Sequence, residues 1–169
     1  GSEMCIETDA ITYDEHGISV IDKKKCIRCG KCIHSCPFGA IGSKSFIVDV
    51  INALREGKHV YAMAAPATEG QFGDDITMAS WKNAMKELGF TDFFDVGLGG
   101  DMTAAYESEE WAEAYKAGEK KVTSCCPAFV NMVRLHYPDL ADCVSTTVSP
   151  MCAVSRLIKA RDPEAITVF

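Results

Sequence analysis

Four cysteines lie close together near the start of this 169-residue chain and limit what its first part can fold into. They are Cys26, Cys29, Cys32 and Cys36, and Pro37 follows the last of them. Three thiolates at every third position can surround one cuboidal cluster, and a four-cysteine run that ends in Cys-Pro is a typical [4Fe–4S] ligand pattern. A structural zinc site is the alternative, but zinc sites usually present two separated pairs of ligands. The spacing therefore predicts a [4Fe–4S] cluster.

The fourth ligand of this cluster stays open between Cys36 and Cys5. In bacterial ferredoxins with two clusters, the cysteine before the proline binds the other cluster, and this chain has one complete run. Residues 9–11 (Asp-Ala-Ile) after Cys5 are similar to residues 39–41 (Gly-Ala-Ile) after Cys36, although the first spacing is one residue longer. We expect three cysteines of the run to bind the cluster together with Cys5 or Cys36: Cys26, Cys29 and Cys32.

Composition excludes several classes of function. A net charge of −7 argues against nucleic acid as a partner, because phosphate binding needs a surplus of Lys and Arg. No apolar run is long enough to cross a bilayer, and no secretory signal pattern opens the chain, so we predict no membrane partner. The nine cysteines are partly clustered and do not suggest a disulfide framework. Clustered thiolates of this kind suit a reducing compartment, and we expect the cytoplasm of an anaerobe.

The chain divides into two regions that differ in composition and in secondary-structure pattern. The predicted fold class is α/β. Residues 1–43 are short, rich in cysteine and rich in turns, and we assign them to a small ferredoxin-like [4Fe–4S] module. Residues 44–169 alternate helical and strand patterns, which predicts a parallel-sheet β/α half-domain of about four strands with flanking helices. We expect helices over residues 47–54, 74–88, 101–117 and 127–136 and from residue 149, and strands over residues 59–65, 93–96, 121–123 and 166–169. Because residues 166–169 end the chain on a strand, we expect both regions to be pieces of a longer protein.

A pair of adjacent cysteines, Cys125 and Cys126, lies where the third predicted strand gives way to a helix. Pro127 follows them, and proline suits the first position of a helix. Thiols at a helix N-terminus are favoured as thiolates by the helix dipole, which suits a metal ligand or a proton carrier. The alternative is two small residues buried in a turn between strand and helix.

The segment Thr-Ser-Cys-Cys-Pro-Ala-Phe, residues 123–129, closely resembles the first signature of the iron-only ([FeFe]) hydrogenases, a Thr-Ser-Cys-Cys-Pro followed by an aromatic residue. The better-known members carry Gly-Trp where this chain has Ala128-Phe129. Further short segments fall in the order of that family: Ala65-Pro66-Ala67, Gly100-Asp101-Met102-Thr103, Tyr137-Pro138-Asp139-Leu140 and Ser149-Pro150. The resemblance covers nearly the whole chain, including the ferredoxin-like module.

The resemblance implies roles for particular residues. Cys126 would bind the cubane part of the active-site cluster, which consists of a [4Fe–4S] cubane and a two-iron part. Cys125 would donate and accept the proton at the two-iron part. Glu107 and Glu110 would continue the proton path, with the Ser145 hydroxyl between them. The alternative for the two glutamates is a solvated helix face, because Glu109 and Glu113 lie on the same predicted helix.

The same resemblance implies the surroundings and partners of the cluster. Ala65, Pro66 and Ala67 would wall the two-iron part. H2 and protons would be the substrates, and a soluble ferredoxin or similar carrier would exchange electrons with the [4Fe–4S] relay. The second family signature, Pro-Cys-x-x-Lys, and a later cysteine pair are not in this sequence. We therefore expect the chain alone to be inactive. The alternative is a non-catalytic iron–sulfur protein of the same fold that transfers electrons or senses redox state or H2.

Overall fold

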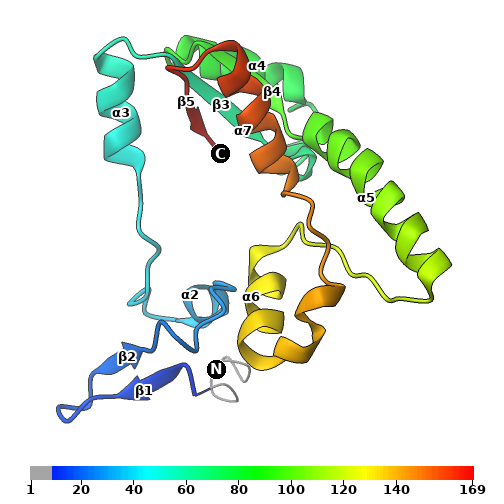
Figure 1. Cartoon of the computed structure of the whole chain (residues 1–169). Helices are drawn as coiled ribbons and strands as arrows, with labels where there is room; N and C mark the ends of the chain where they lie inside the picture. Colours follow the sequence, from blue (N-terminus) through cyan, green and yellow to red (C-terminus); the bar gives the residue numbers. More distant parts are fainter. Residues whose placement is uncertain (1–8) are drawn as a thin grey trace. The chain divides into compact units, whose positions relative to one another are not determined.

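A computed structural model of the chain describes residues 9–169, and Cys5 lies outside the described residues. The chain forms two compact units (Figure 1). The first contains the residues up to Lys44 together with residues 121–145, and the second contains residues 45–120 and 146–169. No helix of the described residues is both long enough and apolar enough to cross a membrane.

The first unit combines a small hairpin with short helices. Strand β1 pairs antiparallel with β2, and Ile11 lies opposite Ile21. The turn between the two strands is fixed by Asp14, whose Oδ1 accepts the backbone N–H groups of His16 and Ile18 at 2.9 and 2.8 Å. The elements of this unit are β1 (Ile11–Tyr13), β2 (Ser19–Ile21), α2 (Lys31–Ser35), α6 (Pro127–His136) and the 3-10 helix η2 (Pro138–Cys143).

The second unit is built on a parallel sheet of three strands in the order β4-β3-β5. Ala62 in the central strand lies opposite Phe93 on one side and Val168 on the other. This confirms the predicted α/β class with parallel pairing. The elements are α3 (Ile47–Arg55), β3 (Val60–Ala64), the 3-10 helix η1 (Pro66–Thr68), α4 (Met78–Glu87), β4 (Asp92–Asp95), α5 (Gly97–Ala117), α7 (Pro150–Arg161) and β5 (Ile166–Val168).

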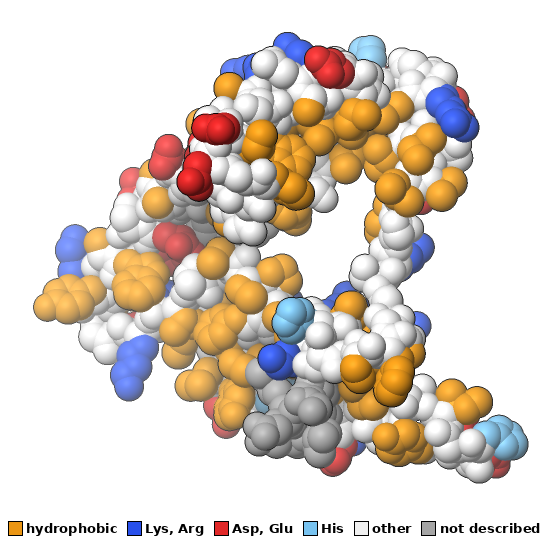
Figure 2. Space-filling view, turned by 180° about the vertical axis from the view of Figure 1, so that it is seen from behind, with side chains coloured by type: hydrophobic (Ala, Val, Ile, Leu, Met, Phe, Trp, Pro, Cys, Tyr) orange, Lys and Arg blue, Asp and Glu red, His pale blue; other side chains and the backbone are white. Residues whose placement is uncertain are grey.

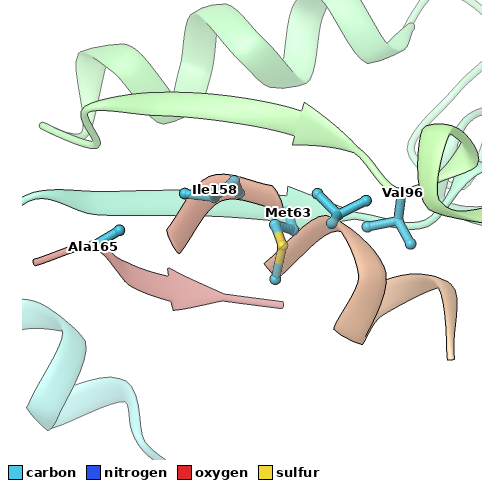
Figure 3. Close-up of a cluster of buried hydrophobic side chains, with 5 residues drawn as sticks. Met63, Val96, Ile158 and Ala165 are labelled. Carbon is cyan, nitrogen blue, oxygen red and sulfur yellow. The ribbon is translucent and has the colours of Figure 1, made fainter. Parts of the chain in front are cut away.

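The core of the second unit lies where α7 packs on the sheet. Met63 of β3 and Val96 at the end of β4 meet Ile158 of α7 and Ala165 before β5 (Figure 3). Val154 of α7 completes the cluster and is fully buried. Burial of such side chains stabilises a fold by about 1.5–3 kcal/mol for each Val, Ile or Met. The cluster therefore fixes the helix that follows residue 149 against the central strand.

Apolar side chains of the second unit also stay on its surface (Figure 2). Ile47 and Val48 on α3 are 64% exposed, and Leu88 after α4 is equally exposed. A hollow of about 640 Å³ lies beside these helices, and Phe90 and Phe169 are among its lining residues. The apolar faces of α3 and α4 are thus not fully covered within the unit.

The segment predicted as the third strand, residues 121–123, is not part of the sheet. Val122 instead forms a single parallel bridge with Val144 in the first unit. Val122 is the only apolar residue between Gly118 and Cys125, so the segment has little apolar surface with which to enter a buried sheet. The sheet of the described residues has three strands rather than the four expected.

Two predicted helix starts are also wrong. Helix α4 begins at Met78 rather than near Asp74, because the Thr77 hydroxyl caps it by accepting the Ser80 N–H at 3.4 Å. Helix α5 begins at Gly97, four residues before the predicted cap at Asp101. Its first backbone N–H, that of Gly97, is accepted by Asp95 Oδ1 at 2.7 Å, so a carboxylate outside the helix replaces the expected cap.

Asp162, just after α7, connects the end of that helix to the start of the central strand. Its Oδ2 lies 2.7 Å from His59 Nδ1 and accepts the Tyr61 hydroxyl at 3.0 Å. Burial acts to raise the pKa of the Asp162 carboxyl, but the hydrogen bonds from His59 and Tyr61 outweigh burial and lower that pKa below its ordinary value. The contact with Asp162 raises the pKa of the Tyr61 hydroxyl, because its proton is donated to a carboxylate.

The lowered pKa of Asp162 predicts a pH-dependent contribution to stability. A carboxyl whose pKa is lower in the folded state stabilises the fold above its ordinary pKa, and the contribution is lost as pH falls through the folded-state value. Asp162→Asn should therefore lower the unfolding temperature most at about pH 6–7 and by less at about pH 3, because the contribution falls as pH drops below the ordinary carboxyl pKa of about 4. Thermal unfolding followed by circular dichroism at both pH values measures this, with Asp75→Asn as the exposed control. An equal loss at both pH values would contradict the assignment.

Candidate functional site

The cysteine run lies in the loop before α2, within that helix and just after it. Cys26 and Cys29 precede the helix, Cys32 lies in its first turn, and Cys36 follows its last residue. Gly30 caps the helix with φ 74°, a left-handed conformation that glycine adopts without strain. The backbone therefore turns at Gly30, between Cys29 and Cys32.

Backbone N–H groups point at two of these sulfurs. The Arg28 N–H donates to Cys26 Sγ and the Ala40 N–H donates to Cys36 Sγ, each at 3.4 Å. The backbone N–H groups of Ala40 and then Phe38 lower the pKa of the Cys36 thiol, because they stabilise its thiolate. Iron–sulfur clusters bind thiolates, and N–H donors to sulfur are one of the levers that set cluster potential. Donor set and N–H pattern fit a [4Fe–4S] cluster.

The four cysteines of the run differ in exposure. Within residues 9–169 no three His, Cys, Asp or Glu side chains are gathered as a metal site would require. Cys29 is exposed and the other three cysteines of the run are half-buried.

Substitution of single cysteines distinguishes the two candidates for the fourth ligand. The anaerobically reconstituted chain should carry about four irons with the EPR signal of a reduced cubane. Of Cys5→Ser and Cys36→Ser, we expect one to lose most of this signal and the other to keep it. Loss with Cys5→Ser would assign Cys36 to a second cluster, and Cys143→Ser is the control that should change nothing. Retention of the cubane in both variants would contradict the ligand set.

Cys125 and Cys126 lie at the start of α6. Cys126 is the residue before the first turn, Pro127 occupies the first helical position, and the Cys126 carbonyl accepts the Val130 N–H at 3.1 Å. Both thiols are exposed, which contradicts the alternative of two buried small residues. The helix start thus presents two accessible sulfurs side by side.

Ser145 directly follows Val144, which forms a bridge with Val122 shortly before Cys125 and Cys126. Its backbone N–H donates to Val122 O at 2.8 Å, and the Val122 N–H donates to Cys143 O at 2.8 Å. Ser145 is 5% exposed, one of two buried polar residues in the described part of the chain. The first unit therefore brings a buried serine beside the strand-like segment that ends at Cys125.

Glu107 and Glu110 share one face of α5 in the second unit. Both are half-buried, whereas Glu109 and Glu113 are exposed. The buried Thr103 lies on the same helix face at the spacing of one turn. Burial therefore separates the two candidate residues from the solvated glutamates of the same helix.

The carboxylate of Glu110 binds the backbone of the chain beside α7. The Thr146 N–H lies 3.2 Å from Oε1 and 3.3 Å from Oε2 of Glu110. A hollow of about 600 Å³ adjoins this contact, and Tyr106 and Arg156 are among its lining residues. Glu110 is thus both a hydrogen-bond acceptor for the backbone and part of the wall of a hollow.

Ala65, Pro66 and Ala67 form the turn at the carboxyl end of the central strand. The Ala65 carbonyl accepts the Thr68 hydroxyl at 2.8 Å, which closes the 3-10 turn η1. A Cβ on Gly97 would lie 3.2 Å from Pro66 Cγ, so the start of α5 approaches this turn closely. In parallel α/β sheets, ligands bind beyond the carboxyl ends of the strands, and the turn lies at that end.

Sequence reasoning missed one residue that supports the cysteine run. Asn131 of α6 donates from Nδ2 to the Ile27 carbonyl at 3.3 Å and so ties the helix that follows Cys126 to the loop of Cys26 and Cys29. The two residues are 104 positions apart, and no local pattern could have indicated the contact.

Comparison with known proteins decides the family. The model for the iron-only hydrogenase large subunit, C-terminal domain, matches residues 58–169, and the model for the 4Fe-4S binding domain matches residues 19–42. The chain belongs to the iron-only hydrogenase family. The second match spans the whole cysteine run and confirms the predicted [4Fe–4S] module.

Curated relatives agree with this hydrogenase assignment. A subunit of the NADP-reducing hydrogenase of Solidesulfovibrio fructosivorans is 33% identical over 74% of this chain and 24% of its own length. Iron hydrogenase 1 of Clostridium pasteurianum is 34% identical over 68% of this chain and 22% of its own length. The periplasmic [Fe] hydrogenase large subunit of Nitratidesulfovibrio vulgaris is 30% identical over 85% of this chain and 45% of its own length. The chain thus spans less than half the length of these relatives.

Solved structures confirm the hydrogenase fold. An apo [FeFe]-hydrogenase from Chlamydomonas reinhardtii matches with a TM-score of 0.64 at 23% identity, over 73% of this chain and 37% of that chain. A second [FeFe]-hydrogenase structure, which describes stepwise assembly of the active-site cluster, matches with a TM-score of 0.63 at 24% identity. At this identity the matches establish the fold.

Proposed function

We propose that this chain is the electron-relay module and first catalytic half-domain of a hydrogenase that interconverts H2 with protons and electrons. The observation that carries the proposal is the pair of exposed thiols, Cys125 and Cys126, at the start of α6 in a chain of the iron-only hydrogenase family. In the longer protein, electrons would pass between the [4Fe–4S] module and the active-site cluster. A soluble ferredoxin or similar carrier would exchange electrons with the module, in the cytoplasm of an anaerobe.

The residues of this chain would bind the cluster and move protons. The active-site cluster supplies the redox chemistry on H2 when it is bound. Cys126 would be a thiolate ligand of its cubane, and Cys125 would carry a proton to and from the two-iron part. Ala65, Pro66 and Ala67 would wall that part and exclude water from it.

The proton would pass from Cys125 through Glu107, Ser145 and Glu110. The burial of Ser145 and the half-buried position of both glutamates support this assignment, because a relay must be shielded from bulk solvent to direct a proton. Carboxylates and hydroxyls at hydrogen-bond distance are common carriers of this kind.

One pair of glutamate substitutions tests the relay. In the longer protein, Glu110→Gln should lower H2 turnover by about 100-fold, because the amide cannot carry the proton. Glu109→Gln, an exposed change on the same helix, should keep turnover within about twofold. Both variants are compared by H2 production at equal cluster content, and equal turnover in the two would remove Glu110 from the path.

The 169-residue chain alone should not turn over H2. Its residues include one of the proposed ligands of the active-site cubane, Cys126, and lack the Pro-Cys-x-x-Lys signature and the later cysteine pair. The missing cysteine signatures also support a rival proposal. In it, the protein is a non-catalytic iron–sulfur protein that kept the fold for electron transfer or sensing.

The coding sequence beyond Phe169 separates the two proposals. A Pro-Cys-x-x-Lys within a few residues and a later close cysteine pair would complete the ligand set and support catalysis. A stop codon at that point, or a continuation without these cysteines, would exclude an active-site cluster and favour the rival.

A further inference from the structure

Basic side chains are concentrated at the cysteine run although the chain as a whole is acidic. Residues 23–31 contain five cationic residues and no acidic one, which gives this segment a formal charge of +5 in a chain of net charge −7. All five side chains are exposed, and the cationic residues are Lys23, Lys24, Lys25, Arg28 and Lys31. We call this segment the basic rim.

The backbone holds the first part of the basic rim in a fixed turn. Asp22 accepts the Lys24 N–H through its side chain at 2.8 Å, and its carbonyl accepts the Cys26 N–H at 2.9 Å. The lysine turn therefore leads directly into the first cluster ligand. Three exposed lysines therefore directly precede Cys26.

Arg28 places a further cation between two cluster ligands. Its φ of 62° is a left-handed conformation that costs free energy in a residue other than glycine. This conformation accompanies the N–H hydrogen bond to Cys26 Sγ, and the exposed Cys29 follows directly. Arg28 thus adds an exposed cation to the ligand loop, one residue before Cys29.

The cations of the basic rim are not neutralised by the described part of the chain. Lys58, Lys82 and Lys86 form ion pairs with carboxylates in the second unit. No ion pair among residues 9–169 engages a cation of the basic rim. An uncompensated cluster of one sign attracts a partner of the opposite sign and speeds its association.

Two apolar side chains of the same module are also exposed. Phe38, two residues after Cys36, is 89% exposed, and Ile33 of α2 is 39% exposed. Protein interfaces commonly combine apolar anchors with a charged rim that fixes orientation. Nucleic acid fits less well, because the net charge of −7 repels a long polyanion beyond this short segment.

We propose that the basic rim, with Ile33 and Phe38, docks a small acidic electron-carrier protein against the [4Fe–4S] module. The proposal rests on the relay role given above. With the cluster bound, one electron would leave the reduced carrier, whose metal centre would be oxidised by one unit, and would enter the cluster of the module, which would be reduced by one unit. No bond forms or breaks. Electron transfer slows steeply with distance, so docking at the ligand loop places the donor where transfer is fast.

Stopped-flow electron transfer to the reconstituted chain tests this docking surface. The donor is a reduced acidic [2Fe–2S] ferredoxin, whose visible spectrum differs from that of a [4Fe–4S] cluster, and the signal is its reoxidation at low and at high ionic strength. The triple variant Lys23→Glu, Lys24→Glu, Lys25→Glu should lower the second-order rate constant by about 10–100-fold at low ionic strength. Its remaining rate should no longer fall as salt is added, because the attraction is gone.

A matched triple variant controls for total charge. Lys116→Glu, Lys120→Glu and Lys159→Glu change the net charge equally with exposed lysines of the second unit. This control should slow the reaction by less than about threefold. Reduction of both variants by dithionite, with unchanged EPR of the cluster, would show that the cluster is intact. Phe38→Ser should lower carrier affinity and leave the salt dependence unchanged.

Three results would overturn this inference alone. One is an equal effect of the two triple variants, and another is a wild-type rate that does not depend on salt. The third is binding of a short DNA duplex more tightly than the ferredoxin at the same salt concentration. Failure of the chain to take up a cluster would overturn the relay role together with this inference. Absence of H2 turnover by the longer protein would overturn the catalytic proposal alone, because this assay does not involve H2.

Discussion

Replacement of Cys125 by alanine in the longer hydrogenase is expected to lower H2 production by about 10²–10⁴-fold, the usual contribution of a positioned proton carrier. The thiol is exposed at the start of α6 and adjoins Cys126, the proposed cubane ligand. Alanine fits the same backbone and leaves Cys126 in place. The loss should therefore come from proton transfer rather than from loss of the cluster.

The measurement compares H2 production from a reduced viologen with iron content and the infrared bands of the two-iron part. Cys125→Ala should keep both cluster signals and lose turnover. Cys143→Ala, a half-buried cysteine at the end of η2, is the control that should keep turnover. Wild-type turnover in Cys125→Ala would contradict the assigned proton path at its first step.

Replacement of Gly99 by alanine is expected to destabilise the second unit by about 3 kcal/mol, at the upper end of overpacking costs. A Cβ at this position would overlap the Pro150 carbonyl oxygen and lie 2.8 Å from Val154 Cγ2. The obstacle is mainly the backbone at the start of α7, which cannot turn aside as a side chain could. Gly99 is thus a point of close approach between α5 and α7.

Gly100, the next residue, is the matched control. Nothing lies within 4 Å of a Cβ there, so Gly100→Ala should raise stability by about 0.5–1 kcal/mol through higher helix propensity. Urea unfolding followed by tryptophan fluorescence measures both variants, because Trp81 and Trp111 are the only tryptophans and both lie in the second unit. Equal changes in the two variants would contradict the close packing of α5 on α7.

The sequence predicted the elements whose signals are local. The apolar run before Pro66 predicted the central strand, and Pro127 and Ser149 predicted the starts of α6 and α7, where the Ser149 hydroxyl accepts the Cys152 N–H at 3.3 Å. The predicted helix starts were wrong where a residue other than the expected cap accepts the first backbone N–H groups of the helix. Asp95 outside α5 accepts the first N–H of that helix, and no short pattern distinguishes this from a cap at Asp101.

Long-range contacts account for what the sequence could not predict about the candidate site. The bridge between Val122 and Val144 brings Ser145 beside the segment of Cys125, although the two valines are separated by a whole helix. In the same way, sequence spacing placed Glu107 and Glu110 on one helix face but did not distinguish a buried face from a solvated one. Their half-buried state depends on what packs against that face of α5, which only the fold reveals.

H2 production by the longer protein, matured with its active-site cluster and supplied with a reduced viologen, tests the central claim most directly. Our account predicts H2 production by that protein and none by the 169-residue chain at equal [4Fe–4S] content. A longer protein that shows iron–sulfur spectra but neither H2 production nor the carbon monoxide and cyanide infrared bands of a two-iron part would contradict it.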